Sequence, residues 1–314
     1  MEFGRAQLGQ SAKQYGFVRD TFEKVLRLKE VLAYLNTQPY LKEHLALKGG
    51  TAINMTVFNL PRLSVDIDLD FTPNLSLADM MIARQKIKEL IHEYMTIEGY
   101  HLSDASRYSH SLDAMLFQYR NAGGNWDNIK IEINYSLRAH LFAPIETQIL
   151  TDIFADDVKI RTLKPMEIFA AKANALMSRA AARDLYDFNN MQYFGLFDKT
   201  EYELFRKCIV FYASISAETI NKTFDTSAID SLNFTKVKRD LFPVLREKNN
   251  FNLEERKQQA KDYIGELMVL TPQEKEYMEA FEKKEYKPEL LFEDKTILEN
   301  IKEHPMALWR MIQK

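Results

Sequence analysis

The chain has a single cysteine, Cys208, so it cannot form a disulfide within itself. A chain without disulfides is typical of a reducing compartment, and we expect a cytoplasmic protein. Cys208 lies in the apolar run FRKCIVFY, which predicts a buried thiol and not a nucleophile. No apolar run reaches the length of about 18 residues that a membrane span needs. The amino-terminal stretch MEFGRAQLGQSAKQYGF lacks the apolar core of a signal peptide.

Glycine and proline are also scarce, with ten and nine copies among 314 residues, and no low-complexity tract is present. Long flexible linkers are therefore not expected. Neither sign of charge dominates, because 42 basic and 45 acidic residues give a net charge of −3. Non-specific coating of nucleic acid needs a large basic excess, so such a partner would have to use a local basic surface.

Hydrophobic periodicity predicts an α/β part followed by a helical part. In the first part, helical spacing or strict alternation predicts helices over residues 18–42, 52–58 and 76–97, and strands over residues 44–48, 63–71, 112–120 and 128–136. A long alanine-rich helix is predicted over residues 163–191, with Pro165 in its first turn, and no convincing strand follows it. We therefore expect an α/β domain over residues 1–160 and an all-helical domain over residues 161–314.

The strand over residues 63–71 carries three carboxylates on one face. Asp66, Asp68 and Asp70 alternate with apolar residues, and side chains two positions apart on a strand point the same way, about 7 Å from each other. Crowded carboxylates disfavour one another's ionised forms unless a cation lies among them. Because hard oxygen ligands suit Mg²⁺, with Mn²⁺ as an alternative, Asp66 and Asp68 are predicted to hold a divalent metal ion.

Other interpretations of this acidic strand exist. A solvent-exposed strand face would need no metal at all. An EF-hand loop beginning at Asp66 is excluded, because Phe71 and Leu77 stand where that loop needs glycine and glutamate. A phosphatase with an Asp-x-Asp nucleophile shares the spacing, but the preceding segment NLPRLSV is not the fully apolar strand that it would normally have. The phosphatase stays open as an alternative.

A Gly-Gly-Thr turn, Gly49 to Thr51, precedes the acidic strand by one short helix. A turn without Cβ atoms lets backbone N–H groups approach a phosphate, and the positive end of the following helix points to the same place. The Thr51 hydroxyl would add a donor. The turn is not a Walker loop, because no Gly-Lys-Ser/Thr follows at the required spacing.

The later strand IKIEINY offers a further acid. Its apolar residues alternate with Lys130, Glu132 and Asn134, so these three share a face. Beside Asp66 and Asp68, Glu132 would be a third metal ligand or a general base. Otherwise Glu132 would pair with Lys130 on an exposed sheet face.

Together these segments resemble the nucleotidyltransferase core of the DNA-polymerase-β type. More narrowly, KGGTAINM, PRLSVDIDLDF, AAKANALMSRAAARDLYDF and the tail segments YKPELLF and HPMALWR resemble the AbiEii family, the group that includes the mycobacterial MenT-type nucleotidyltransferase toxins. The resemblance runs from about residue 15 to the carboxyl end. It implies an α+β fold, in which a polymerase-β-like core with a mixed sheet flanked by helices precedes an all-helical carboxy-terminal domain that completes the active-site cleft.

The resemblance also implies individual roles. Lys172 would contact the nucleoside triphosphate and Asp184 would be an active-site acid with Asp187 beside it. The nucleotide-binding residues that it implies are Lys48, Gly49, Gly50, Thr51, Arg62, Ser64, Lys172 and Arg179.

On one continuous helix, Lys172, Leu176, Arg179 and Arg183 would fall within an arc of about 60°. Asp184 would lie about 120° from Lys172, so the two would converge only if the helix bends or the cleft is wide. A simpler role for Asp184 or its neighbour is an ion pair with Arg179, Arg183 or Arg62.

The predicted function is Mg²⁺-dependent transfer of a nucleoside monophosphate from an NTP to an acceptor hydroxyl. The resemblance implies an RNA acceptor, notably the 3′ end of tRNA, and a winged-helix antitoxin encoded beside this toxin of an abortive-infection pair. Residues 236–240, KVKRD, with Phe234 and Phe242 nearby, are candidate RNA contacts. Two alternatives stay open: transfer to a small molecule such as an antibiotic, and a catalytically silent interaction protein on the same fold.

Overall fold

The structure of the chain is a computed structural model that describes residues 4–150, 153, 157–216, 223–246 and 251–313. The chain divides into two compact units. The first, here called the sheet unit, consists of Met1–Arg138, Pro144–Leu163 and Pro243–Asn249. The second, the helical unit, consists of Ala139–Ala143, Lys164–Phe242 and Asn250–Lys314. The short segment Ala139–Ala143 therefore belongs to the helical unit although the chain on both sides of it belongs to the sheet unit, and the reverse holds for Pro243–Asn249.

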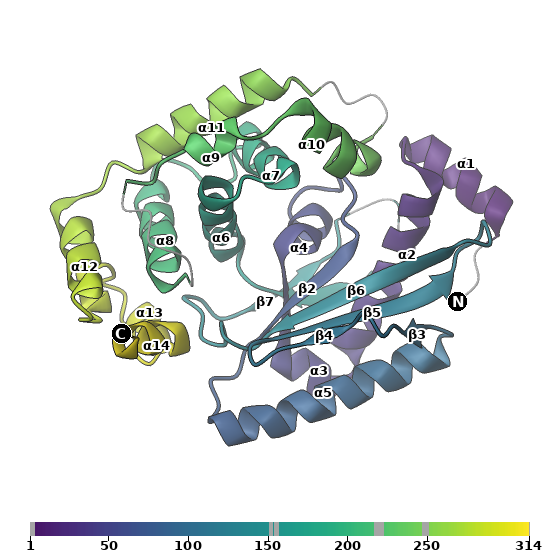
Figure 1. Cartoon of the computed structure of the whole chain (residues 1–314), viewed down its shortest axis with the longest axis horizontal. Coiled ribbons are helices and arrows are strands. Elements are labelled where there is room, and N and C mark those ends of the chain that lie inside the picture. The colour runs from purple at the N-terminus through teal and green to yellow at the C-terminus, as the bar shows by residue number, and fades with distance from the viewer. Residues whose placement is uncertain (1–3, 151–152, 154–156, 217–222, 247–250, 314) are drawn as a thin grey trace. The chain divides into compact units, whose positions relative to one another are not determined.

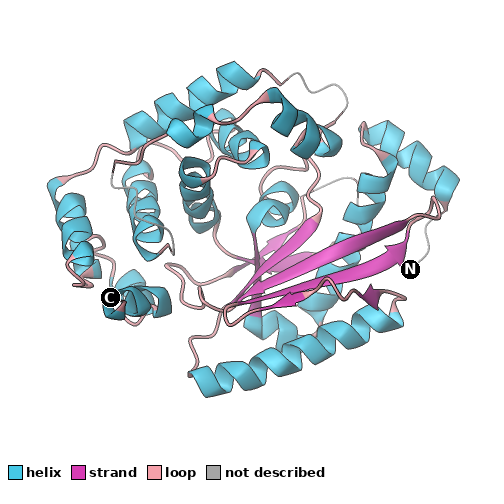
Figure 2. Ribbon diagram, in the orientation of Figure 1, coloured by secondary structure: helices cyan, strands magenta, loops and turns pink. Residues whose placement is uncertain are grey.

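The sheet unit is built on one mixed sheet (Figures 1 and 2). Its eight strands run in the order β3-β5-β6-β2-β1-β8-β7, with β4 paired to β5. The central strand β2 pairs antiparallel with β1 and parallel with β6. The expected mixed sheet flanked by helices is thus confirmed. The strands are β1 (Leu45–Lys48), β2 (Asp66–Phe71), β3 (His101–Leu102), β4 (Arg107–Tyr108), β5 (Leu112–Arg120), β6 (Trp126–Asn134), β7 (Ile145–Gln148) and β8 (Lys159–Thr162).

Helices cover the sheet in the first unit and make up the second (Figure 2). No helix in the described part of the chain has the length and apolarity to cross a membrane. The helices of the sheet unit are α1 (Arg5–Tyr15), α2 (Arg19–Thr37), α3 (Pro39–His44), α4 (Gly49–Thr56) and α5 (Leu77–Ile97). Those of the helical unit are α6 (Pro165–Ser178), α7 (Ala182–Tyr193), α8 (Tyr202–Ile215), α9 (Ser227–Asp230), α10 (Phe234–Asp240), α11 (Leu253–Leu267), α12 (Pro272–Glu282), α13 (Lys295–Ile301) and α14 (Pro305–Ile312).

One face of the sheet is apolar and lies under helices α2 and α5. Ile131 of β6 is fully buried on this face. The same face of β5 carries Asp113 and Tyr119. The guanidinium of Arg84 from α5 bonds to Asp113, and that of Arg27 from α2 lies 4.2 Å from the centre of the Tyr119 ring. The opposite face, which carries the carboxylates of β2, is therefore left for the candidate site.

The elements depart from the predicted ones in a few places. The helix predicted over residues 18–42 is two helices, because Pro39 starts α3 and has no N–H to continue α2. The strands β3, β4, β7 and β8 were not predicted, since each is only two to four residues long. Cys208 is fully buried, which confirms the buried thiol, and burial raises its pKa.

Candidate active site

The Gly-Gly-Thr turn forms the first residues of α4 and lies directly against the acidic strand. The pairing of β1 with β2 places Lys48 opposite Asp68, and α4 begins at the next residue, Gly49. Gly49 has a φ of 70°, which favours glycine. A Cβ atom on Gly49 would lie 2.5 Å from Asp68 Oδ2. Only glycine therefore allows the start of α4 to approach this carboxylate so closely.

The second glycine lies against a buried cation. A Cβ atom on Gly50 would lie 2.8 Å from Arg62 Nη2 and 3.1 Å from Ser64 Oγ. Arg62 is 2% exposed, and its Nη1 donates to the Leu63 carbonyl at 2.8 Å. The first N–H groups of a helix carry partial positive charge, and here a guanidinium and a hydroxyl stand beside them. This end of α4 therefore has the donors and the charge that a phosphate group needs.

Thr51 joins α4 to the acidic strand. Its buried hydroxyl donates to the backbone carbonyl of Asp66. Asn54, one turn later, donates from Nδ2 to the Gly50 carbonyl at 2.9 Å. The Thr51 hydroxyl, expected from sequence to face a phosphate, therefore bonds inside the fold and fixes where β2 begins relative to the turn.

The acids of β2 and β6 are neighbours. The parallel pairing places Asp68 beside Glu132 and Asp66 beside Lys130. The pKa of Asp68 is raised to about 6, chiefly by burial and further by the negative charges of Asp66 and Glu132, against the lowering effect of Lys48. Like charges held together in a partly buried place are typical of a site that binds a cation.

Two of the neighbouring acids already have cationic partners. Glu132 Oε2 lies 2.8 Å from Lys130 Nζ, and Asp70 Oδ1 lies 2.5 Å from Lys48 Nζ. Glu132 therefore stands beside Asp68 and also forms the expected pair with Lys130, while its role as a metal ligand or general base stays a prediction. Within the described ranges, no three acidic, histidine or cysteine side chains are grouped so that they could hold a metal ion by themselves.

The residues present nevertheless suit Mg²⁺ in the form in which it accompanies phosphates. Mg²⁺ binds proteins through one or two carboxylates and takes waters and substrate phosphate oxygens as its other ligands. Asp66 and Asp68 provide two hard oxygen donors on one strand face. Because Gly49 has no Cβ atom, which would collide with Asp68, the N–H donors at the start of α4 can lie next to these two carboxylates. A preformed cage of three or more protein ligands is not required by this chemistry.

In the helical unit, the predicted helix over residues 163–191 is wrong. The structure has two helices, α6 ending at Ser178 and α7 beginning at Ala182, and Ala180 between them has a φ of 44°. The predicted basic stripe therefore does not lie on one helix face.

The break brings together residues that a straight helix would separate. Lys172 Nζ lies 2.8 Å from Asp184 Oδ1 and 2.9 Å from Asp187 Oδ2. All three residues are buried, and Asp187 is fully buried. Arg179, which is largely exposed, reaches Asp184 Oδ2 only at 3.8 Å. Asp184 therefore pairs mainly with Lys172, and its predicted pairing with Arg179 is a weaker second contact.

Comparison with known proteins decides the family. The model of the nucleotidyl transferase AbiEii toxin family, of type IV toxin–antitoxin systems, matches residues 30–284. The chain belongs to the AbiEii family. Its fold is similar to that of MenT4, a nucleotidyltransferase toxin from Mycobacterium tuberculosis, with a TM-score of 0.64 and 14% identity over 88% of this chain and 94% of that one. No curated protein matches the chain.

This AbiEii protein is accordingly a nucleotidyltransferase toxin of a type IV toxin–antitoxin system, and the family resemblance inferred from its motifs is confirmed. The expected mixed sheet flanked by helices, with a helical region after it, agrees with the structure. A nucleotidyltransferase of this family uses a nucleoside triphosphate as its co-substrate.

The RNA contacts proposed from sequence lie at the surface of this AbiEii protein. Phe234 is 59% and Phe242 37% exposed, and their rings meet edge to face with centroids 5.6 Å apart. Arg239 of α10 pairs with the adjacent Asp240 at 2.6 Å. The basic segment is therefore partly neutralised by its own acid.

Sequence reasoning missed the burial of Asp187, which was named only as a neighbour of Asp184. A signal was present, because residues three apart on a helix share a face, and both carboxylates could thus meet one cation. The contact between Gly49 and Asp68 had no local signal, since it depends on the pairing of β1 with β2.

Proposed function

We propose that this AbiEii nucleotidyltransferase transfers a nucleoside monophosphate from an NTP to the 3′ end of an RNA, with tRNA as the acceptor, in a Mg²⁺-dependent reaction. One observation carries the proposal: the start of α4 lies against the carboxylate of Asp68. A phosphate-binding helix end and a pair of crowded carboxylates are thereby adjacent, which is the arrangement that a metal-bound triphosphate requires.

The residues of the sheet unit have separate roles in this proposal. Asp66 and Asp68, with Glu132 beside them, would hold Mg²⁺ or Mn²⁺, which when bound neutralises phosphate charge and acts as a Lewis acid. The backbone donors of Gly50 and Thr51 bind phosphate oxygens, supported by a set of nearby side chains. These are Lys48, Arg62 and Ser64.

Glu132 acts as the general base. Its carboxylate takes the proton of the acceptor hydroxyl while the acceptor oxygen forms a bond to the α-phosphorus and the bond to pyrophosphate breaks. Pyrophosphate carries away the electron pair of that bond, and the positive end of α4 together with Arg62 balances its charge. Most of the acceleration comes from positioning and from electrostatic stabilisation, because the protein forms no covalent bond with the substrate.

For the helical unit, we propose that Lys172 contacts the triphosphate and that Asp184 orients the Lys172 ammonium. The ion pairs at 2.8 and 2.9 Å support this role, because they hold a long flexible side chain in one conformation. Arg179, exposed and 3.8 Å from Asp184, is proposed as a further contact to the nucleotide.

The proposed biological setting follows from the family. A type IV toxin has an antitoxin partner, and we propose that it is a winged-helix protein encoded beside the toxin. We place the reaction in the cytoplasm, where NTPs and tRNA are available and where a buried free thiol stays reduced.

The test is a labelling experiment with matched acids. Purified wild type, Asp66→Asn, Asp68→Asn and the control Asp104→Asn, which alters an exposed acid between β3 and β4, are each incubated with α-labelled NTPs, Mg²⁺ and total tRNA. Wild type and control should label RNA, and each site variant should be slower by about 100-fold or more. Equal labelling by Asp66→Asn would remove that residue from the mechanism.

The same preparations separate the alternative functions. Label on an antibiotic or metabolite and none on RNA would favour small-molecule transfer. If calorimetric titration with Mg²⁺ and each NTP gives no heat, the catalytically silent interaction protein is favoured instead.

A further inference from the structure

The β5–β6 hairpin has one face that is not part of the apolar core. Along β6, Ile129, Ile131 and Ile133 are buried, while the residues between them are half-buried or exposed. Trp126, at the start of the strand, is 55% exposed. The register of β5 with β6 places the outward residues of both strands on this face. We call it the hairpin face, and it consists of Leu116, Gln118, Arg120, Trp126, Asn128 and Lys130.

The chemistry of the hairpin face suits a single-stranded polynucleotide. The guanidinium carbon of Arg120 lies 4.0 Å from the centre of the Trp126 ring. Lys130, which pairs with Glu132 at 2.8 Å, adds a second cation, Gln118 and Asn128 add amides, and none of the six residues is acidic. Exposed aromatic rings stack with unpaired bases, and cations along the same track bind the phosphates. The face thus combines both kinds of contact.

The hairpin face is continuous with the candidate active site. Lys130 pairs in register with Asp66, and Glu132, the next outward residue of β6, pairs with Asp68. Glu132 lies six positions after Trp126 along the strand, a distance of about 20 Å. A strand laid along β6 with one base on Trp126 can therefore bring its end to the carboxylates.

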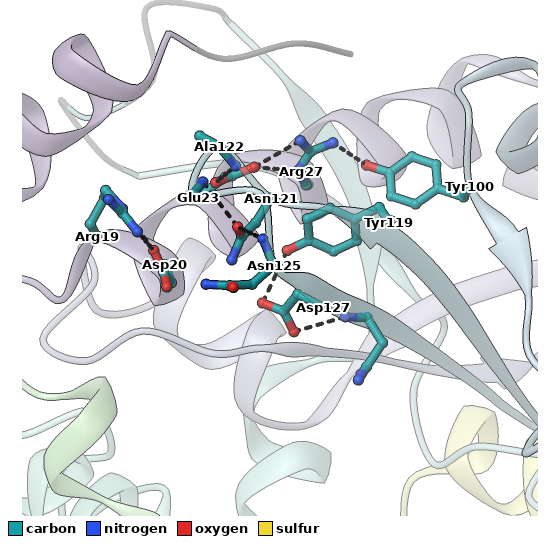
Figure 3. Close-up of polar contacts among 12 residues, drawn as sticks. Arg19, Asp20, Glu23, Arg27, Tyr100, Tyr119, Asn121, Ala122, Asn125 and Asp127 are labelled. Atoms are coloured by element: carbon teal, nitrogen blue, oxygen red, sulfur yellow. Dashed lines mark hydrogen bonds and ion pairs between the residues drawn. The ribbon is translucent and has the colours of Figure 1, made fainter.

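The hairpin is also held rigidly from its other side, by α2 (Figure 3). Glu23 accepts two hydrogen bonds from Arg27, at 2.7 and 3.0 Å, and its second oxygen accepts the N–H of Ala122 in the hairpin turn at 2.8 Å. Arg27 in turn lies over the ring of Tyr119 on β5. A rigid surface loses little conformational entropy when it binds a ligand, so the hairpin is preorganised for contact.

We infer that the hairpin face binds the unpaired 3′-terminal segment of an RNA, with one base stacked on Trp126, and directs its terminal hydroxyl toward Asp68 and Glu132. The choice of RNA and the direction of the strand rest on the proposed function. The binding itself does not, because it requires neither an NTP nor transfer.

The two tryptophans of the chain make binding directly observable. A Trp309→Phe variant leaves Trp126 as the sole tryptophan, and it is titrated with single-stranded RNA in the absence of NTP. Stacking should quench the fluorescence in a saturable way, and the affinity should fall as salt is raised. Trp126→Ala should weaken RNA binding, measured by anisotropy of a labelled oligonucleotide, by about ten-fold.

Tyr108→Ala is the matched control. Tyr108 is an equally exposed aromatic residue of the same sheet, but it pairs in register with Asp113 and lies near Lys88 of α5, so it belongs to the opposite face. This variant should bind RNA as the wild type does. Unchanged Trp126 fluorescence, or equal weakening by Tyr108→Ala, would overturn the inference. Equally tight binding of single-stranded DNA would overturn the assignment to RNA.

The two proposals can fail separately. If RNA quenches Trp126 but no nucleotide is transferred to any RNA, the proposed function is wrong and the hairpin surface stands. If RNA is labelled and Trp126→Ala leaves the KM for RNA unchanged, the function stands and the hairpin inference is wrong.

Discussion

At the scale of single residues, Asp68 links the candidate site to stability. Its folded-state pKa of about 6 lies above its ordinary value of 3.8. The folded protein therefore binds the Asp68 proton more tightly than the unfolded chain does. The stability that this contributes is present below about pH 4 and is lost as the pH rises to about 6.

Asp68→Asn removes this pH dependence. At about pH 7.5 the variant should raise the free energy of unfolding of the metal-free protein by about 3 kcal/mol, and near pH 4 it should change it little. Urea unfolding in the presence of a chelator at both pH values measures the difference. The same increment at the two pH values would show that repulsion at Asp68 is not the cause.

Gly49 is the residue that lets helix and carboxylate meet. Gly49→Ala would force an alanine to a φ of 70° and place its Cβ against Asp68, which should destabilise the protein by about 1–2 kcal/mol and weaken NTP binding. Gly265→Ala is the control, because Gly265 lies in α11 with nothing near its Cβ position. There, alanine should stabilise by about 0.5–1 kcal/mol. Urea unfolding and calorimetry give both values, and a harmless Gly49→Ala would contradict the close approach.

At the scale of elements, the break between α6 and α7 is stabilised by a buried ion cluster. Lys172→Met would leave Asp184 and Asp187 close together without their cation, so it should destabilise the protein by about 3 kcal/mol. Adding Asp187→Asn to Lys172→Met removes one of the two negative charges that repel each other, so it should restore part of that stability. Urea unfolding of the single and double variants forms the test. Strictly additive losses would mean that the three charges do not interact.

The sequence predicts those elements whose pattern of apolar and polar residues lies within their own segment, and it misses those that depend on contacts with other segments. The strands β2 and β6 and the helix α5 follow from local alternation and spacing, and their predicted ranges agree with the structure within a few residues. The break at Ala180 has no such signal, because alanine favours a continuous helix and rarely adopts the φ of 44° that Ala180 has in the structure. The strand β8 is only four residues long, and it is in the sheet because it pairs with β1.

The same distinction applies to the candidate site. The alternation around Asp66, Asp68 and Glu132 predicts the face on which each lies, and the pairing of β2 with β6 agrees. The approach of Gly49 to Asp68 and the buried position of Arg62 depend on tertiary packing, so no pattern along the chain predicts them.

At the scale of the whole molecule, the sheet unit needs a late part of the chain. Leu63 donates its backbone N–H to the Val244 carbonyl at 2.8 Å, and the backbone of Arg62 forms an isolated antiparallel β-bridge with that of Leu245. Both partners belong to the segment Pro243–Asn249, which follows most of the helical unit in sequence. The backbone around Arg62 is therefore fixed by residues that a fragment ending at Leu163 would lack.

A divalent ion and a triphosphate are expected to meet between the start of α4 and the carboxylates of β2. The decisive measurement is a crystal structure with Mn²⁺ and a non-hydrolysable NTP analogue, recorded at a wavelength that reveals manganese. We predict a manganese peak bound by Asp66 and Asp68, with phosphate oxygens on the N–H groups of Gly50 and Thr51. A manganese peak elsewhere, or a triphosphate away from the turn at residues 49–51, would show that this is not the active site.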